Sequence, residues 1–313
     1  MEANRLFMVN ELGARYSADG ITLISVPKDL TTYKVLDGTL EITKDAFKDS
    51  LIEEVVLPDT ITSIGNSAFS GCKSLRNINL PLSIREIGYD AFYDCASLKK
   101  IWLPECIDEI RIDTFKGCKS LEKIYIPSGL ECIGLGAFQG CSSLRSVVIP
   151  ELCIIDSYAF SGCTALSQIK LPILINKICG EEFGQEVFGR CTSLKSVDYW
   201  YDYIPSRTFA GCSSLEYLKL RDRLGMVEED AFYFCDSLCK VEFLVAPHPE
   251  FNDFVNFYKW KENKEIEFVI PEGTEESFIK LFKLAHENPN IRITVKSDNQ
   301  KQSEIEEEGS LIQ

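Results

Sequence analysis

Cysteine is the residue type in this 313-residue chain whose number and spacing most suggest chemistry. Of its 13 cysteines, eight recur inside one octet of residues, which first appears as AFSGCKSL, at intervals of 21 to 28 residues. The eight are Cys72, Cys95, Cys118, Cys141, Cys163, Cys191, Cys212 and Cys235. Thiols at such a spacing are compatible with four roles, which are metal binding, nucleophilic catalysis, disulfide bonding and packing in a core.

Metal binding and catalysis both require partner residues that the repeats do not contain. Zinc sites use close pairs such as Cys-x-x-Cys, or cysteine with histidine, and a catalytic thiol needs a nearby base. The chain has only His248 and His286, and both follow the last octet. Glycine-rich phosphate loops and His-Glu-x-x-His motifs are also missing. We therefore predict no catalytic residue, no metal site and no cofactor.

Disulfide bonding and core packing both remain open for the repeated cysteines, and packing is favoured. Equivalent positions on adjacent turns of a stacked repeat lie roughly 5 Å apart, which is within disulfide range. However, side chains at equivalent positions point the same way, whereas a disulfide needs a specific relative geometry. The chain also has no secretory signal, no Asn-x-Ser/Thr sequon and no apolar stretch of membrane-spanning length, which indicates a reducing compartment. Buried thiols acting as small hydrophobic groups are therefore expected.

The segments between octets repeat as well and predict the elements that position the thiols. Leu-x-x-Ile-x-Leu ends in strict alternation, which is typical of a short strand with one buried face. Proline often follows directly and ends the strand, and the Ala-Phe pair favours a tight turn. A single cycle has nothing of its own against which to bury its apolar residues. Successive cycles are therefore expected to stack, with their strands forming a parallel sheet.

The full pattern, Ile-Gly-x-x-Ala-Phe-x-x-Cys-x-Ser-Leu-x-x-Ile-x-Leu-Pro, resembles the BspA-like class of leucine-rich repeats over roughly residues 46–245. The resemblance implies an α/β repeat protein. It would be a curved leucine-rich-repeat solenoid with a parallel β-sheet on its concave face and little regular helix in the repeats. Members of this class occur in host-associated bacteria and some protozoa, and are often surface or secreted proteins of adhesion and interaction.

The ends of the chain depart from the repeat, as the ends of a solenoid must, because an open apolar end would aggregate. We expect amino-terminal cap strands over 1–45 and about nine repeats over 46–245. A carboxy-terminal α+β cap is expected over 246–295, with a capped amphipathic helix in EESFIKLFKLAHENP between two strands. The polar, acidic stretch 296–313 is expected to be disordered.

The outward positions of the strand motif are the first candidate for a binding surface. The net charge of −15 argues against nucleic acid as a partner, because phosphate binding needs clustered Lys and Arg. Over eight cycles, however, these outward positions carry nine basic and four acidic residues, 9 − 4 = +5. We predict a basic strip with interleaved aromatic residues that faces an acidic protein partner; the alternative is that the lysines only keep an exposed sheet soluble. The candidate residues are Arg76, Lys100, Trp102, Lys123, Tyr125, Arg145, Lys170, Lys195, Tyr217 and Lys219.

A second candidate is the irregular cycle between Cys163 and Cys191, where the period stretches to 28 residues. The cycle after it reads SVDYWYDYIP and supplies the candidate residues Trp200, Tyr201 and Tyr203. Insertions in repeat proteins often map to loops on one face and carry binding. The alternative is that these rings only repack a distorted turn.

Together these features predict a non-catalytic protein-binding module without membrane insertion. The resemblance favours an adhesion or surface-interaction protein. The alternative is an intracellular scaffold or regulatory protein, which the lack of an export signal and the abundant cysteine favour. The oligomeric state is left unassigned.

Overall fold

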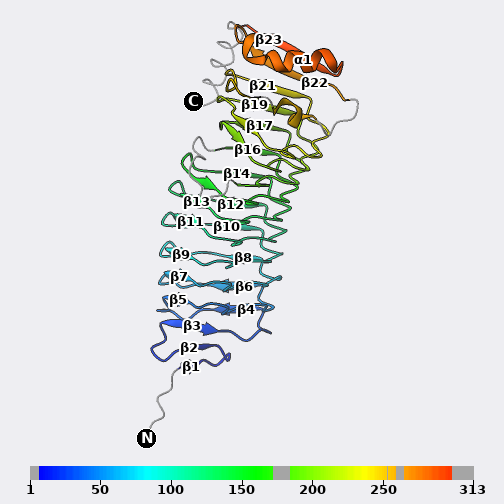
Figure 1. Cartoon of the computed structure of the whole chain (residues 1–313). Helices are drawn as coiled ribbons and strands as arrows, with labels where there is room; N and C mark the ends of the chain where they lie inside the picture. The colour runs from blue at the N-terminus through cyan, green and yellow to red at the C-terminus, as the bar shows by residue number, and fades with distance from the viewer. Residues whose placement is uncertain (1–6, 172–183, 252, 259–263, 298–313) are drawn as a thin grey trace.

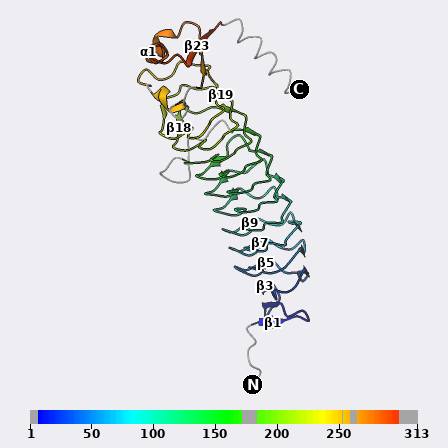
Figure 2. The same cartoon turned by 90° about the vertical axis from the view of Figure 1, so that its right-hand side faces the viewer.

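The structure, a computed structural model, describes residues 7–171, 184–251, 253–258 and 264–297. The chain winds into an elongated solenoid of about eleven turns, with successive turns stacked in chain order from one end to the other (Figure 1). The stack bends along its length, as a view turned by 90° makes clear (Figure 2). The expected class, a leucine-rich-repeat solenoid with little helix, is confirmed.

A repeat turn contributes two short strands, so parallel strands line up in two columns along the solenoid. The first column, called here the long-strand face, holds the strand of the Leu-x-x-Ile-x-Leu motif. It comprises β4 (Thr32–Lys34), β6 (Glu54–Val56), β8 (Asn77–Ile78), β10 (Lys100–Trp102), β12 (Lys123–Tyr125), β14 (Ser146–Val148), β16 (Gln168–Lys170), β17 (Ser196–Tyr199), β19 (Tyr217–Leu220), β21 (Lys240–Phe243), β22 (Ile266–Pro271) and β23 (Ile291–Lys296).

The second column, the short-strand face, follows the proline turn in each cycle. It comprises β3 (Thr22–Ser25), β5 (Glu41–Ile42), β7 (Ser63–Ile64), β9 (Glu86–Ile87), β11 (Glu109–Ile110), β13 (Cys132–Ile133), β15 (Ile154–Ile155), β18 (Tyr203–Ile204) and β20 (Met226–Val227). In both columns equivalent residues of successive turns pair directly, as Trp102 does with Tyr125 and Ile110 with Ile133. A position in the repeat therefore becomes a row of side chains along the solenoid.

The Ala-Phe turn builds a stack of aromatic rings through the core. Ring centroids of successive phenylalanines lie 4.6 to 5.8 Å apart, with interplanar angles of 16° or less, from Phe47 to Phe232. These rings are almost completely buried. The turns are joined by backbone hydrogen bonds such as the one that Phe115 donates to Ala137. In the described repeats this segment forms a turn, as expected, and contains no helix.

The eight repeat cysteines lie beside the ring stack as buried thiols that are not joined in disulfides. The packing interpretation is therefore confirmed and the disulfide alternative is wrong. Each thiol also donates a hydrogen bond to the carbonyl oxygen of the phenylalanine one turn earlier, with Sγ–O distances of 3.0 to 3.3 Å. Cys118, for example, bonds to Phe92, and Cys141 bonds to Phe115. The repeated thiols are thus polar links between turns as well as small core groups.

The residue two places after each phenylalanine adopts a left-handed backbone conformation. Glycine fills this position in most octets, and Gly117 and Gly140 have φ of +77° and +75°. Asp94, Arg190 and Phe234 hold the same conformation with side chains attached, at φ of +53°, +60° and +58°. Glycine is favoured there because it lacks the Cβ that makes this region costly.

Both ends of the solenoid close with structure of a different kind. At the amino end β1 (Phe7–Val9) and β2 (Arg15–Ser17) pair antiparallel ahead of β3. At the carboxyl end the 3₁₀ helix η1 (Asp253–Phe257) precedes β22, and η2 (Glu275–Phe278) leads into α1 (Ile279–Glu287) before β23. The α+β cap is as predicted, but its helix begins as 3₁₀ without a side-chain cap, because the Thr274 hydroxyl donates to the Pro271 carbonyl instead.

Candidate protein-binding site

The middle of the long-strand face carries a compact cluster of aromatic and basic side chains, which we call the central patch. It consists of Lys99, Lys100, Trp102, Lys123, Tyr125, Arg145 and Val148, from strands β10, β12 and β14 and the residues just before them. All seven side chains are exposed. Lys100 and Trp102 share a side with Lys123 and Tyr125 because alternate residues of a strand point the same way and the parallel register repeats that side in the next turn. Lys99 and Arg145 come directly before strands of this face.

The aromatic pair of the central patch is a direct consequence of the strand register. Trp102 and Tyr125 are paired residues on β10 and β12, and their rings stack with centroids 4.6 Å apart and planes 7° from parallel. Their exposed fractions are 43% and 38%. Val148 occupies the same position on β14 and is 82% exposed. Three successive turns therefore present an apolar row to solvent.

Lysines accompany the aromatic row on the same strands. The Lys100 Nζ lies 5.1 Å from the Trp102 ring centroid, and the Lys123 Nζ lies 4.8 Å from that of Tyr125. A cation over an aromatic face is attracted electrostatically to the ring, and the contact orders both side chains. Within the described residues no carboxylate forms an ion pair with the lysines or the arginine of the central patch. Their charge is available to a partner.

Two predicted residues at the border of the central patch have carboxylate neighbours within the chain. Arg76 contacts Glu53 at 3.5 Å and Lys170 contacts Glu151 at 3.3 Å. Both pairs are exposed, and exposed pairs are weak. Arg76 and Lys170 can therefore turn to a partner at small energetic cost.

Farther along the same face, two predicted residues lie in an internal network and not on an open surface. Lys219 is only 8% exposed, so its predicted place on the open face is wrong. Tyr217 is half-buried, and its hydroxyl donates a hydrogen bond to Glu242. Lys296 of the last strand also donates to Glu242, at 2.7 Å. These side chains bury one another because charges of opposite sign occupy the same position on successive turns, Asp198, Lys219 and Glu242.

The electrostatics of Glu242 reflect this pairing. Burial alone would raise the pKa of its carboxyl, but hydrogen bonds from Lys296 and Tyr217 outweigh burial and lower the pKa below its usual value. On the same face Arg221 donates from Nε and Nη2 to one oxygen of Asp198, at 3.0 and 2.7 Å. Lys195, just before β17, stays exposed. In the carboxyl-terminal turns Arg221 and Lys296 are thus paired with carboxylates of the chain, in contrast to the cations of the central patch.

The second candidate, the aromatic cluster after the irregular cycle, is largely internal. Tyr201 is buried, and its ring lies 5.0 Å from that of Tyr199 in an edge-on contact. Tyr203 is half-buried and donates its hydroxyl to Glu228. Trp200 is half-buried beneath the Arg221 guanidinium, 4.9 Å from the ring centroid. These contacts favour the alternative interpretation, in which the rings repack a distorted turn; residues 172–183 of the stretched cycle lie outside the described residues.

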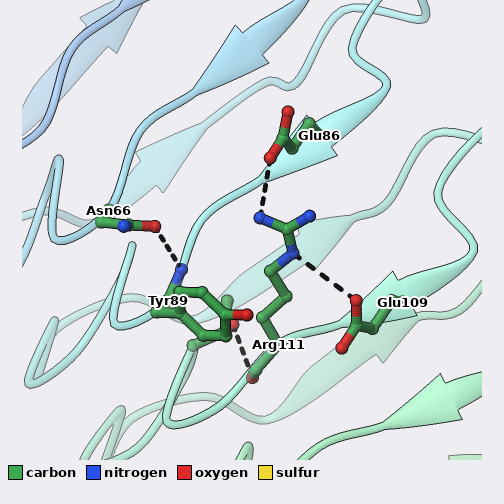
Figure 3. A network of polar contacts seen from close by, with 6 residues as sticks. Asn66, Glu86, Tyr89, Glu109 and Arg111 are labelled. Carbon is green, nitrogen blue, oxygen red and sulfur yellow. Dashed lines mark hydrogen bonds and ion pairs between the residues drawn. The ribbon is translucent and has the colours of Figure 1, made fainter.

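On the short-strand face Arg111 is paired within the chain, in a cluster that Figure 3 shows across three turns. The Arg111 guanidinium reaches Glu86 on one turn at 2.7 Å and Glu109 on its own turn at 3.5 Å. It also lies 5.3 Å from the Tyr89 ring centroid, and Asn66 accepts a hydrogen bond from the Tyr89 backbone N–H at 2.9 Å. The Arg111 guanidinium is therefore already paired with carboxylates of its own chain.

Within the described residues, no group of three or more His, Cys, Asp or Glu side chains is arranged to hold a metal ion. The helices of the same described residues include none with the length and apolarity needed to cross a membrane. Sequence reasoning missed Val148 as part of the site. Its signal was its position in the repeat, the same as that of Trp102 and Tyr125.

Solved structures of bacterial leucine-rich-repeat proteins share this architecture. A leucine-rich repeat protein from Bacteroides ovatus is 24% identical, with 93% of this chain and 90% of that one covered and a TM-score of 0.53. A leucine rich cell surface protein from Faecalibacterium prausnitzii is 18% identical, with 95% and 96% covered and a TM-score of 0.53. The leucine rich repeat protein of T. pallidum is 31% identical over 60% of this chain and 86% of its own, with a TM-score of 0.50.

The stacked turns and the open strand face thus define a leucine-rich-repeat protein, a class that generally serves as a non-catalytic binding scaffold. The family model described as "BspA type Leucine rich repeat region" matches in six copies, over residues 40–167, 143–247 and 181–283. The chain belongs to this family. Among curated proteins, no relative matches.

Proposed function

We propose that the protein is a protein-binding module whose central patch recognises an acidic segment of a partner. The observation that carries the proposal is the contrast between charges along one face. Cations of the central patch have no carboxylate partners among the described residues, whereas Arg221 and Lys296 of the carboxyl-terminal turns are paired with Asp198 and Glu242. A sheet that needed lysine only for solubility would gain nothing from the stacked, exposed aromatic pair between those lysines.

The composition of the central patch suits protein recognition. Aromatic residues and arginine are enriched at the energetic centres of protein interfaces, and Trp102 and Tyr125 are already held in place by stacking. Preordered side chains lose less conformational entropy when a partner binds. Lysines around them supply electrostatic steering toward an acidic surface.

We further propose that this binding serves adhesion or surface interaction. Proteins of the BspA type typically act in protein interaction or at surfaces, and the similar protein from Faecalibacterium prausnitzii is described as a cell surface protein. Labelling intact cells of the native organism with a membrane-impermeant reagent tests this. Labelled protein supports surface display, whereas protein recovered only after lysis would instead favour the scaffold role inside the cell.

The binding proposal is tested by reversing charge in the central patch. We expect Lys100→Glu/Lys123→Glu to weaken binding of a fluorescent hexaglutamate peptide at least about tenfold, since two attractive contacts become repulsive. Wild-type affinity should fall as salt is added. The matched control is Lys34→Glu/Lys280→Glu, which changes the net charge equally at exposed positions outside the central patch.

Equal affinity of the two double variants would contradict the proposed site, because only the total charge would then matter. Single-stranded RNA of the same net charge serves as a second probe. We expect it to bind more weakly than the peptide, since the remainder of the surface is strongly acidic.

A further inference from the structure

A hollow adjoins the central patch on its amino-terminal side. It measures about 400 Å³ and lies between β6 and β8 and the turns that follow them. Its apolar lining includes Val56, Leu80 and Leu82, and the Leu82 side chain is 81% exposed.

The hollow lies on the same row of strand positions as the aromatic pair of the central patch. Strand register places Val56, Asn79, Trp102 and Tyr125 at the same position of four successive turns. Asn79 stands between the valine and the tryptophan and lines the hollow. The hollow and the aromatic pair of the central patch therefore lie along one row, and a single turn separates Asn79 from Trp102.

Charge changes sign between the hollow and the central patch. Glu54 and Asp59 line the hollow, whereas Lys99, Lys100 and Lys123 flank the aromatic pair. An acidic side chain is repelled from the first region and attracted to the second. A segment that binds both must therefore present a bulky neutral side chain at one end and carboxylates farther along.

We propose that the hollow is an anchor subsite for one large apolar side chain of the partner, whose acidic residues then lie along the central patch. This inference rests on the proposed function and specifies the ligand as an extended segment with a neutral anchor ahead of an acidic run. From the hollow to the midpoint between Lys100 and Lys123 is about two turns, roughly 10 Å. An extended chain covers this distance in about three residues.

The spacing defines the probe. A fluorescent peptide with one tryptophan, two glycines and then six glutamates places the anchor and the acidic run at this separation. We expect it to bind wild-type protein about tenfold more tightly than the same peptide with alanine in place of tryptophan, because buried aromatic anchors dominate binding energy. A third peptide with tryptophan in the middle of the acidic run should resemble the alanine peptide.

A variant that fills the hollow completes the test. Asn79→Trp should lower affinity for the tryptophan peptide about tenfold and leave affinity for the alanine peptide unchanged. Ser196→Trp is the matched control, because Ser196 is also an exposed strand residue of this face but lies far from the hollow. Circular dichroism melting of both variants verifies that each is folded.

The outcomes separate the two proposals. Equal binding of the tryptophan and alanine peptides to wild type would overturn the anchor subsite, as would an Asn79→Trp variant with unchanged preference. The proposed function would survive either result provided that Lys100→Glu/Lys123→Glu still weakened both peptides. Loss of that charge effect would overturn both.

Discussion

At the residue scale, the repeated thiol combines two properties that few side chains share. It is small enough to lie beside the stacked phenylalanine rings, and it carries a weak donor that reaches a carbonyl oxygen of the preceding turn. The same carbonyl also accepts the backbone N–H of the cysteine three residues later, as Phe92 does from Cys95. In the first, cysteine-free cycle Ser50 occupies the equivalent buried position, which is a site for a small donor.

This dual role predicts an order of stabilities at Cys118. We expect Cys118→Ala to lower the free energy of unfolding by about 2 kcal/mol, since it removes both packing and the bond to Phe92. Cys118→Ser should cost about half as much, because a hydroxyl can still donate. Urea denaturation followed by circular dichroism measures both. Were the thiol only a small hydrophobic group, alanine would be tolerated better than serine.

At the scale of the element, the parallel register is the feature that organises the molecule. It converts each repeat position into a row, so that phenylalanines stack on phenylalanines and Trp102 stacks on Tyr125. Removing one side chain from such a row therefore removes packing contacts from both neighbouring turns. The ring of Phe138, for instance, lies between those of Phe115 and Phe160, at 5.5 and 5.3 Å.

Removing one ring from the stack should therefore be severe. We expect Phe138→Ala to destabilise the protein by about 3–5 kcal/mol, because it leaves a cavity and removes two ring contacts. Phe234→Ala is the matched control, since Phe234 belongs to an octet as well but is exposed. Thermal melting should separate the two variants clearly. Similar melting temperatures would contradict a core role for the stack.

At the scale of the whole molecule, the row of buried repeat cysteines makes the stability of the solenoid sensitive to alkaline pH. Burial raises the pKa of the Cys163 and Cys212 thiols from 9.0 to about 12, and it raises those of Cys95, Cys141 and Cys191 well above 9.0. Above pH 9 the unfolded chain loses these protons while the folded chain keeps them. The unfolded state then binds fewer protons, so stability falls as pH rises.

We expect the thiol contribution to be fully present below pH 9 and to be lost between pH 9 and about 12. Each buried thiol should contribute a slope of about 1.4 kcal/mol per pH unit in that window. Urea midpoints measured from pH 7 to 11 test this, with Cys163→Ala as the comparison. The stability of the variant should fall less steeply with pH than that of wild type, by about 1.4 kcal/mol per pH unit, since one buried thiol is missing. Identical slopes would contradict the linkage between these thiols and stability.

Much of this architecture could be predicted from the sequence, because every turn repeats the same local pattern of apolar and turn-forming residues. The octets fixed the period, the alternation in Leu-x-x-Ile-x-Leu defined the strand, and the proline marked its end. Register then follows, since a slip by one residue would expose the isoleucines and leucines. The row containing Trp102 and Tyr125 was predictable for the same reason.

Which outward side chains remain open to a partner was decided only by the tertiary structure. Lys100 and Lys219 occupy similar motifs, yet the first is exposed and the second is buried in a network that Lys296 joins from the last strand. Likewise, the hollow beside Asn79 depends on side chains from adjacent turns. The sequence by itself determined the repeating core, because burial there depends on local pattern. Exposure and charge pairing depend on residues from different turns, which only folding brings together.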